Sequence, residues 1–282
     1  MLKPGGSVHV VATSGAVDIE RIEAGANVLR AWGHRVEVDP AVGVRYRYLA
    51  GADATRLESL RRAADAAWAD GGAVWMARGG YGLARLLPDL IASPLPPVPF
   101  IGFSDGTVLL NHHRGPCVHG PVINSLIGHA DTDSLAHLRA VLAGENPALR
   151  GEQWLAGEAA GRLAGGNLCV LASLAGTPGA LRARGCIVAL EDTGEAPYKL
   201  DRLLTQLIQG GAFDGVRGFA LGTFDGADVP AGAEWSVRDV LIERLSPFNV
   251  PILGGLPFGH GPANRAFRFG HARIEGNQLI WG

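Results

Sequence analysis

Short apolar runs alternate with segments of helical periodicity through the first third of this chain. The run VHVV at residues 8–11 reads as a strand, residues 18–32 carry apolar residues at helical spacing, and residues 34–38 alternate like a second strand. A helix over residues 54–69 and a strand over residues 73–77 continue the pattern. Strand–helix–strand units of this kind form parallel sheets with right-handed crossovers. The sequence therefore predicts an α/β fold, and 282 residues are enough for one large domain or two modest ones.

Glycine-rich turns follow two of the expected strands. The strand at residues 73–77 runs into the sequence RGGYG at 78–82, and the apolar run VPFI at 98–101 runs into GFSDG at 102–106. Open α/β sheets bind ligands at the carboxyl ends of their parallel strands. Both turns are therefore expected at the edge of the sheet where a functional site would lie.

Ser104 stands between glycines at a turn from strand to helix, which is the pattern of a nucleophile elbow. Such a turn exposes the hydroxyl and leaves backbone N–H groups at the start of the helix free to face an anion. The pattern alone also fits a Ser or Asp that only caps the helix. Partners for Ser104 elsewhere in the chain must decide between these interpretations.

Composition changes after residue 144, where the chain becomes polar, rich in glycine and weakly periodic. We expect an α/β domain over residues 1–148, a linker over 149–159 and a second domain over 160–282. The second half is richer in short strands and turns, with helices expected at 200–208 and 237–245 and a terminal hairpin at 273–281.

Charge and cysteine usage exclude several classes of protein. The net charge is −2 with no basic block, so no nucleic-acid partner is expected. The cysteines Cys117, Cys169 and Cys186 form no C-x-x-C pair, so neither a disulfide framework nor a metal site is expected, and Cys169 and Cys186 are expected to pack in the core. No stretch has the length or apolarity of a membrane span or secretion signal, which indicates a soluble, cytoplasmic protein.

A serine nucleophile needs a base, usually a histidine, oriented by a carboxylate. His112 and His113 lie about two helical turns beyond Ser104, too far along the axis to reach it. His119 and His260 both stand beside glycine and proline in a turn. His260 is the stronger candidate, because glycines on both sides permit a sharp, exposed presentation.

Three carboxylates are candidates for the orienting acid: Glu191, Asp192 and Glu195. Glu191 directly ends an apolar strand, so the sheet would fix its position, as an orienting carboxylate requires. Asp192 and Glu195 fit turn or N-cap roles at least as well.

Several motifs, in order along nearly the whole chain, resemble one family, the LD-carboxypeptidases, a group of serine peptidases that also contains the microcin C immunity peptidases. The motifs are VATSG at 11–15, YLAGAD at 48–53, RGGYG at 78–82, IGFSDGT at 101–107, HGP at 119–121, GGNL at 165–168, LED at 190–192 with Glu195, Tyr198 with Asp201-Arg202, and FGHG at 258–261. The pair RGGYG and GFSD is the most specific.

The resemblance implies a flavodoxin-like parallel-sheet N-terminal domain and a smaller β-rich, swivelling β/β/α-like C-terminal domain, with the site between them. It implies a Ser-His-Glu triad of Ser104, His260 and Glu191, and an oxyanion hole from the backbone N–H groups of Gly80 and Asp105. It also implies a cytoplasmic homodimer without a cofactor, whose substrate is a small peptide. The typical reaction removes terminal D-alanine from a murein tetrapeptide in peptidoglycan recycling.

Other functions stay open. A microcin-type peptidase would cleave acyl-sulfamoyl-adenylates and would need an aromatic platform such as Trp154 or Trp235, but the Tyr-x-x-Asp-Arg pattern at 198–202 favours the cell-wall peptidase. An α/β-hydrolase esterase shares the G-x-S-x-G pattern, although RGGYG fits that fold poorly. A catalytically dead module that binds cell-wall peptides is the alternative outside the enzymes.

An exopeptidase must also bind the free carboxylate of its substrate, and arginine suits this task because its donors are bidentate. The sequence does not choose between Arg78, Arg202 and Arg265.

Overall fold

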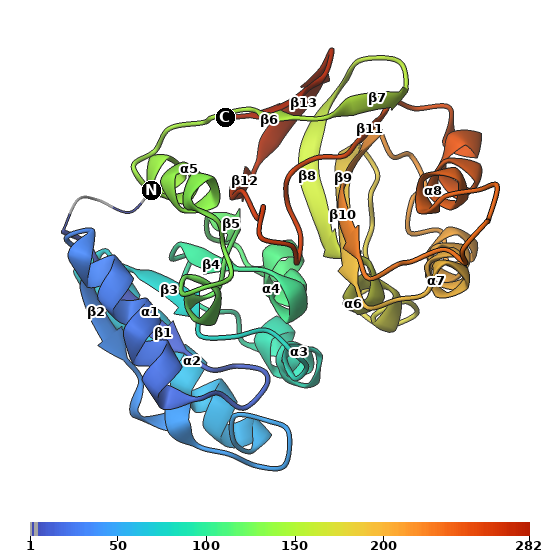
Figure 1. Ribbon diagram of the computed structural model, residues 1–282. Coiled ribbons are helices and arrows are strands. Elements are labelled where there is room, and N and C mark those ends of the chain that lie inside the picture. Colours follow the sequence, from blue (N-terminus) through green and yellow to red (C-terminus); the bar gives the residue numbers. More distant parts are fainter. Residues whose placement is uncertain (1, 3–4) are drawn as a thin grey trace. The chain divides into compact units, whose positions relative to one another are not determined.

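The computed structural model describes residues 2 and 5–282 and divides into two compact units (Figure 1). The first unit comprises Met1–Glu145 and Arg265–Arg268, and the second comprises Asn146–Asn264 and Phe269–Gly282. Residues 149–159, expected as a linker, instead contain two short strands of the second unit, β6 (Leu149–Arg150) and β7 (Glu152–Leu155). Their sequence is polar because β7 is largely exposed, and the linker expectation is corrected accordingly.

The first unit is built on a six-stranded sheet. Its strands are β1 (Ser7–Val11), β2 (Arg35–Val38), β3 (Ala73–Met76), β4 (Phe100–Gly102), β5 (Cys117–His119) and β12 (Phe267–Phe269), in the order β12-β5-β4-β3-β1-β2. The pairs from β2 through β1, β3 and β4 to β5 are parallel. The order 2-1-3-4-5 is that of flavodoxin-like folds, so the predicted fold of this domain is confirmed.

The helices of this unit are α1 (Ile19–Ala31), α2 (Asp53–Asp70), α3 (Leu83–Ala92), α4 (Thr107–His112) and α5 (Thr132–Leu142), with short 3-10 helices η1 (Pro40–Gly43), η2 (Ser104–Gly106) and η3 (Ile123–Ser125). Helices α1 to α4 connect successive strands of this sheet, and α5 follows β5. Local signals set their ends: Asp18 caps α1 by accepting from the Glu20 N–H, and Gly71 ends α2 in the left-handed conformation. The strands are fully buried at β1, β3, β4 and β5, as expected for a sheet covered by helices.

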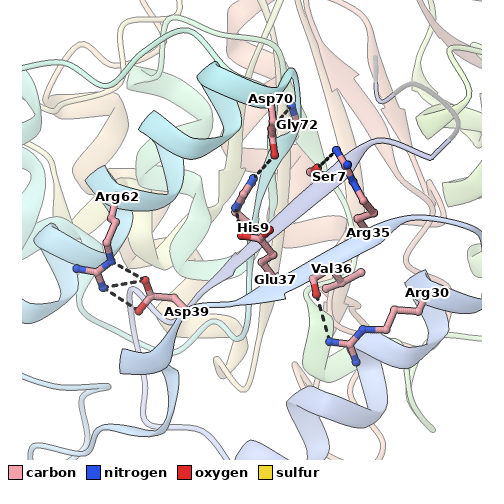
Figure 2. Close-up of polar contacts among 10 residues, drawn as sticks. All are labelled: Ser7, His9, Arg30, Arg35, Val36, Glu37, Asp39, Arg62, Asp70 and Gly72. Carbon is pink, nitrogen blue, oxygen red and sulfur yellow. Dashed lines mark hydrogen bonds and ion pairs between the residues drawn. The ribbon is translucent and has the colours of Figure 1, made fainter.

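Polar contacts join β1, β2 and α2 (Figure 2). His9 of β1 is buried, and its Nε2 lies 3.1 Å from Asp70 Oδ2 at the end of α2. Arg62 of α2 contacts both oxygens of Asp39, which follows β2. These contacts fix α2 on the sheet and give His9 a structural role.

The second unit holds an eight-stranded mixed sheet in the order β6-β14-β13-β8-β9-β10-β11-β7. Its further strands are β8 (Ala159–Asn167), β9 (Cys186–Thr193), β10 (Gly218–Asp225), β11 (Ile252–Gly254), β13 (His271–Glu275) and β14 (Gln278–Trp281). The pairs β8–β9, β9–β10 and β10–β11 are parallel, and the others are antiparallel. The terminal hairpin β13–β14 lies where the sequence predicted one, and the β-rich character of this domain is confirmed.

Three helices pack beside strands β8 to β10, as Figure 1 shows: α6 (Leu168–Ser173), α7 (Pro197–Gln209) and α8 (Val237–Leu245). A short 3-10 helix, η4 (Ser246–Phe248), follows α8. Apolar side chains of these helices and strands form one cluster, in which Phe213 and Phe219 meet edge to face at 5.3 Å. Cys186 belongs to this core, as expected, whereas Cys169 on α6 is only half-buried, which corrects its expected placement. Among the described residues, no helix combines the length and apolarity needed to cross a membrane.

Candidate active site

Ser104 lies just after β4, at the start of η2 and ahead of α4. Its backbone has φ +60°, and Ser104 is one of three non-glycine residues with positive φ in the described part of the chain. This left-handed conformation costs a residue with a Cβ about 1–2 kcal/mol, and such strain is concentrated at functional sites. The local geometry is therefore that of a nucleophile elbow.

The RGGYG turn approaches Ser104 through Gly79. A Cβ added to Gly79 would lie 2.9 Å from both Ser104 Oγ and Ser104 Cβ, which is closer than real Cβ atoms come. Gly79 does not have positive φ, so the absence of a side chain, and not the backbone conformation, is what this position requires. The turn after β3 and the turn after β4 are thus in direct contact, as their common sheet edge predicted.

Two backbone N–H groups border this contact. The Gly79 carbonyl accepts a hydrogen bond from the Gly15 N–H at 3.2 Å, and in a trans peptide the N–H of the next residue, Gly80, points the opposite way. Gly80 has φ +109°, which favours glycine there. The Asp105 nitrogen lies 3.8 Å from the Cβ position of Gly79. Of the two expected oxyanion donors, Asp105 directly follows Ser104, and Gly80 directly follows Gly79, whose Cβ position contacts Ser104.

The Asp105 carboxylate joins three loops. Its Oδ2 accepts from Ser14 Oγ at 2.5 Å, after β1, and from the Leu83 N–H at 2.9 Å, at the start of α3. Asp105 therefore caps the neighbouring helix α3, and not its own helix as the sequence suggested. Burial raises the pKa of this carboxyl, while the Ser14 and Leu83 donors and the Arg56 charge oppose the rise. Asp105 therefore links the turn after β4 to the turn after β1 and to the start of α3.

Arg56 on α2 supports the same loops from inside. Its side chain is fully buried and donates to the carbonyls of Thr13 and Gly51 and to the Asp53 carboxylate. A Cβ on Gly82 would lie 2.5 Å from the Arg56 guanidinium. Periodicity placed Arg56 on a helix but gave no signal that it was buried, so the sequence did not single it out. Ser14 could have been singled out, because it lies in the turn that follows the parallel strand β1.

Glu191 and His260 meet in the second unit. Glu191 lies on β9 and is fully buried, and its Oε2 is 2.7 Å from Nδ1 of His260. His260 remains about one fifth exposed, so one edge of the ring can face a substrate. This is the contact by which a carboxylate fixes the tautomer and orientation of a histidine base. The structure thus brings together the two candidates that the sequence favoured.

The charges around His260 set its protonation. Burial alone would lower the pKa of His260, but the hydrogen bond and charge of Glu191, with the charges of Asp192 and Asp225, outweigh burial and raise the pKa. The raised pKa makes the imidazole a stronger proton acceptor than an isolated one.

The loop that carries His260 is held against β10. The Thr223 N–H donates to the Phe258 carbonyl at 2.9 Å, and the register of β9 and β10 shifts between Leu221 and Phe224. Gly259 has φ +140°, and a Cβ there would lie 2.2 Å from Thr223 Oγ1. An irregular strand that redirects a loop is common beside active sites. No local pattern points to Thr223, because its role depends on this irregularity in the strand.

The other acid candidates have structural partners. Asp192 accepts from the Asn167 side chain at 3.0 Å and from the Cys169 N–H at 2.9 Å, so it caps α6. Burial and the neighbouring Glu191 charge raise the pKa of Asp192 to about 6. Glu195 pairs with Lys199 at 3.3 Å. Asp192 thus has a cap role, which the sequence allowed, whereas Glu195 forms an ion pair with Lys199 in place of a helix cap.

His119, the second candidate base, is fully buried in the first unit. Its ring stacks on Phe267 with centroids 4.7 Å apart and meets the edge of Phe103 at 5.8 Å. A ring enclosed by aromatic side chains serves packing, so the geometry favours His260 as the base. Within residues 2 and 5–282, no group of three or more His, Cys, Asp or Glu side chains is arranged to hold a metal ion.

The candidate aromatic platforms differ in exposure. Trp154 packs against Gly254 and the core of the second unit, and the Arg238 guanidinium lies 5.0 Å above its ring. Trp235 is 43% exposed and is the more accessible of the two.

Comparison with known proteins gives a consistent result over both units. The profile of the LD-carboxypeptidase N-terminal domain matches residues 8–118, and that of the LD-carboxypeptidase C-terminal domain matches residues 160–274. The murein tetrapeptide carboxypeptidase of Pseudomonas aeruginosa is 39% identical over 297 residues, covering 98% of this chain and 95% of the relative.

Solved structures also resemble this chain over nearly its whole length. The muramoyltetrapeptide carboxypeptidase of Oxalobacter formigenes superimposes with a TM-score of 0.84 at 26% identity, covering 98% of this chain and 99% of that one. A structure of MccF, a microcin C7 self immunity protein, in complex with glutamyl sulfamoyl guanosine superimposes with a TM-score of 0.85 at 20% identity, covering 100% and 97%. At that identity the second likeness shows a shared fold alone.

Proposed function

Because the chain belongs to the LD-carboxypeptidase family, we propose that it releases terminal D-alanine from murein tetrapeptides by hydrolysing an L,D-amide bond. Membership makes the protein a serine-type LD-carboxypeptidase, and the name of the Pseudomonas aeruginosa relative supports the murein tetrapeptide as substrate. The observation that carries the catalytic assignment is the 2.7 Å hydrogen bond between His260 and the fully buried Glu191.

In the proposed mechanism, Ser104 Oγ attacks the carbonyl carbon of the scissile amide while His260 Nε2 takes the hydroxyl proton. Glu191 holds the proton on Nδ1 and stabilises the imidazolium that forms. The N–H groups of Gly80 and Asp105 donate to the oxyanion, and losing one such donor typically costs on the order of 100-fold or more in rate.

The tetrahedral intermediate then collapses. The C–N bond breaks, the amine of the leaving D-alanine takes the proton from His260, and the peptide remains as an ester on Ser104. Water, deprotonated by His260, attacks this ester and releases the shortened peptide with Ser104 restored. The backbone strain at Ser104 supports the assignment, because it holds the hydroxyl out from the end of β4.

The test is mass-spectrometric detection of D-alanine release from a murein tetrapeptide. We expect release by the wild type and none by Ser104→Ala with an unchanged unfolding temperature. A substrate that ends in L-alanine controls for the stereochemistry of the bond. Retained activity in Ser104→Ala would contradict the nucleophile assignment.

A second candidate function is cleavage of acyl-sulfamoyl-adenylates, which the complex of MccF and the exposure of Trp235 favour. Assaying such a compound beside the tetrapeptide separates these two functions.

Two further alternatives have their own tests. Activity on simple p-nitrophenyl esters without peptide cleavage would indicate a general esterase. A fluorophosphonate label that fails to attach to Ser104 would indicate a binding module without catalysis.

The proposal also covers the compartment, the pathway and the oligomeric state of the enzyme. We propose that the enzyme acts in the cytoplasm, in peptidoglycan recycling, as a homodimer. Light scattering coupled to size-exclusion chromatography tests the dimer, and fractionation of cells tests the compartment.

A further inference from the structure

Arg78 directly precedes Gly79 in the turn that contacts Ser104, and its guanidinium lies against the loop after β1. Arg78 is the residue before Gly79, whose Cβ position lies 2.9 Å from Ser104 Oγ. The Arg78 side chain turns toward the loop after β1: its Nη1 donates to the Ala16 carbonyl at 2.6 Å, and its Cζ lies 3.7 Å from the Cβ position of Gly15. The Gly15 N–H in turn donates to the Gly79 carbonyl. Arg78 is therefore fixed at the sheet edge that carries the nucleophile.

Within the described residues, the charge of Arg78 has no carboxylate partner. Arg78 is exposed, and among residues 2 and 5–282 its hydrogen bond is to the neutral carbonyl of Ala16, with no ion pair to an acid. A guanidinium has five N–H donors in a planar fork, so a single bond to a carbonyl leaves a face able to hold a carboxylate with two parallel hydrogen bonds. The nearby ion pair of Arg85 with Asp53 shows the usual alternative, an arginine whose charge is matched within the protein.

The other two candidate arginines are engaged differently. Arg265 pairs with Asp133 at 3.7 Å, so its charge already has an acid partner. The guanidinium of Arg202 lies 5.8 Å above the exposed ring of Tyr198. Of the three arginines that the sequence left open, Arg78 alone combines an unmatched charge with a position one residue from the turn that touches Ser104.

We propose that Arg78 binds the terminal carboxylate of the substrate and thereby makes the enzyme a carboxypeptidase and not an endopeptidase. This inference rests on the proposed function. In a carboxypeptidase substrate, the free carboxylate is one residue beyond the scissile bond, and one residue of extended chain spans about 3.5 Å. A carboxylate receptor must therefore stand within about one residue of the oxyanion site, which is where Arg78 stands relative to Gly79 and Gly80.

A role of Arg78 in supporting the fold can be distinguished from a role in binding the carboxylate of the substrate. A residue that only supports the fold affects all substrates alike, whereas a carboxylate receptor acts only on substrates that carry the carboxylate. Charge-assisted, bidentate contacts of this kind are worth roughly 10- to 100-fold in an equilibrium or specificity constant. Replacing the carboxylate by a primary amide removes the charge with little change in size.

The experiment compares two murein tetrapeptides, one with a free terminal carboxylate and one with a terminal amide, on wild type and Arg78→Gln. We expect the wild type to prefer the free acid by roughly 10- to 100-fold in kcat/KM. Arg78→Gln should lose that factor on the free acid, mostly through KM, while its kcat/KM for the amide stays within about twofold. Arg78→Lys should recover part of the preference, because it restores the charge without the fork.

Arg202→Gln and Arg265→Gln are matched controls that remove the same charge elsewhere, and both should keep the wild-type preference. The inference is overturned if Arg78→Gln lowers both substrates equally, if it leaves the preference intact, or if either control abolishes the preference instead. Thermal unfolding of each variant checks that the fold is retained. Failure of the wild type to cleave either peptide would overturn the proposed function and this inference with it.

Discussion

Glu191 reaches His260 with one carboxylate oxygen, at 2.7 Å from Nδ1, while its other oxygen is buried without a hydrogen-bond partner among the described residues. Within the described residues, the hydrogen bond to the imidazole is thus the one hydrogen bond of this carboxylate. This geometry makes the protonation of His260 depend strongly on the charge of Glu191, and it leads directly to a pH-dependence that can be measured.

Glu191→Gln should lower kcat roughly 10²- to 10⁴-fold, because the amide cannot stabilise the imidazolium. His260 must be neutral to accept a proton, so kcat/KM rises as the pH rises through the pKa of His260. Glu191 raises that pKa against the effect of burial. The acidic limb of the pH profile should therefore move to lower pH in Glu191→Gln, as measured by kcat/KM across the range in which histidine titrates.

Asp225→Asn is the matched control for that experiment. Asp225 adds to the raised pKa of His260 and accepts from Thr223 Oγ1 at 2.6 Å, a hydrogen bond that an asparagine oxygen can keep. In Asp225→Asn, the acidic limb of the pH profile should move in the same direction as in Glu191→Gln but by less, and most of kcat should be retained. An unmoved limb in Glu191→Gln would show that the carboxylate does not set the protonation of His260.

Ser104→Gly should be more stable than Ser104→Ala, although both are inactive. Ser104 has φ +60°, a conformation that alanine adopts with strain and glycine without it. We expect a free energy of unfolding about 1 kcal/mol higher in the glycine variant, measured by denaturant titration. Equal stability of the two variants would mean that the elbow is not strained.

Gly79→Ala should block the nucleophile while keeping the fold. The new Cβ would lie 2.9 Å from Ser104 Oγ, so the serine must shift. Displacement of a reacting group by about 1 Å typically costs on the order of 100-fold in rate, which is the loss in kcat that we expect. Gly43→Ala is the control, because Gly43 has no heavy atom within 4 Å of its Cβ position and does not have positive φ. Comparable losses in both variants would exclude the steric explanation.

Ser14→Ala should weaken both stability and activity. It removes the 2.5 Å hydrogen bond to the buried Asp105 carboxyl, and a buried acceptor that loses its donor costs about 1–3 kcal/mol. The elbow should loosen as well, so kcat should fall more than KM rises. Ser59→Ala is the control: Ser59 is also buried, and its hydroxyl has no partner among the described residues, so its removal should be nearly neutral. Circular dichroism melting and steady-state kinetics measure both effects.

The first unit was largely predictable, because β1, β3 and β4 are short apolar runs, β2 has an alternating pattern, and the turns after β3 and β4 carry glycine. Parallel strands then bring the turns after β1, β3 and β4 to one edge, so the contact of Gly79 with Ser104 follows from topology. The burial of Arg56 could not be foreseen, since it depends on carbonyls of Thr13 and Gly51 that only the folded chain presents to it.

The second unit was harder because its central strand has little local strand preference. β8 has the sequence AAGRLAGGN, and it becomes a strand by pairing with β9 on one side and β13 on the other. Its glycines permit that pairing: a Cβ on Gly165 would lie 2.1 Å from the Ala189 carbonyl oxygen. The glycine-rich sequence of β8 therefore carried no local strand signal, although close packing against β9 is what requires Gly165.

The return of residues 265–268 to the first unit has a consequence for dissecting this protein. The strand β12 is the outer neighbour of β5 in the first sheet, and Phe267 is the stacking partner of His119. A fragment cut at the 145/146 boundary would lose both and would expose the backbone of β5 as an open edge, which invites pairing with other chains and aggregation. Ser104, the proposed nucleophile, therefore resides in a unit that cannot be excised as one continuous stretch of chain.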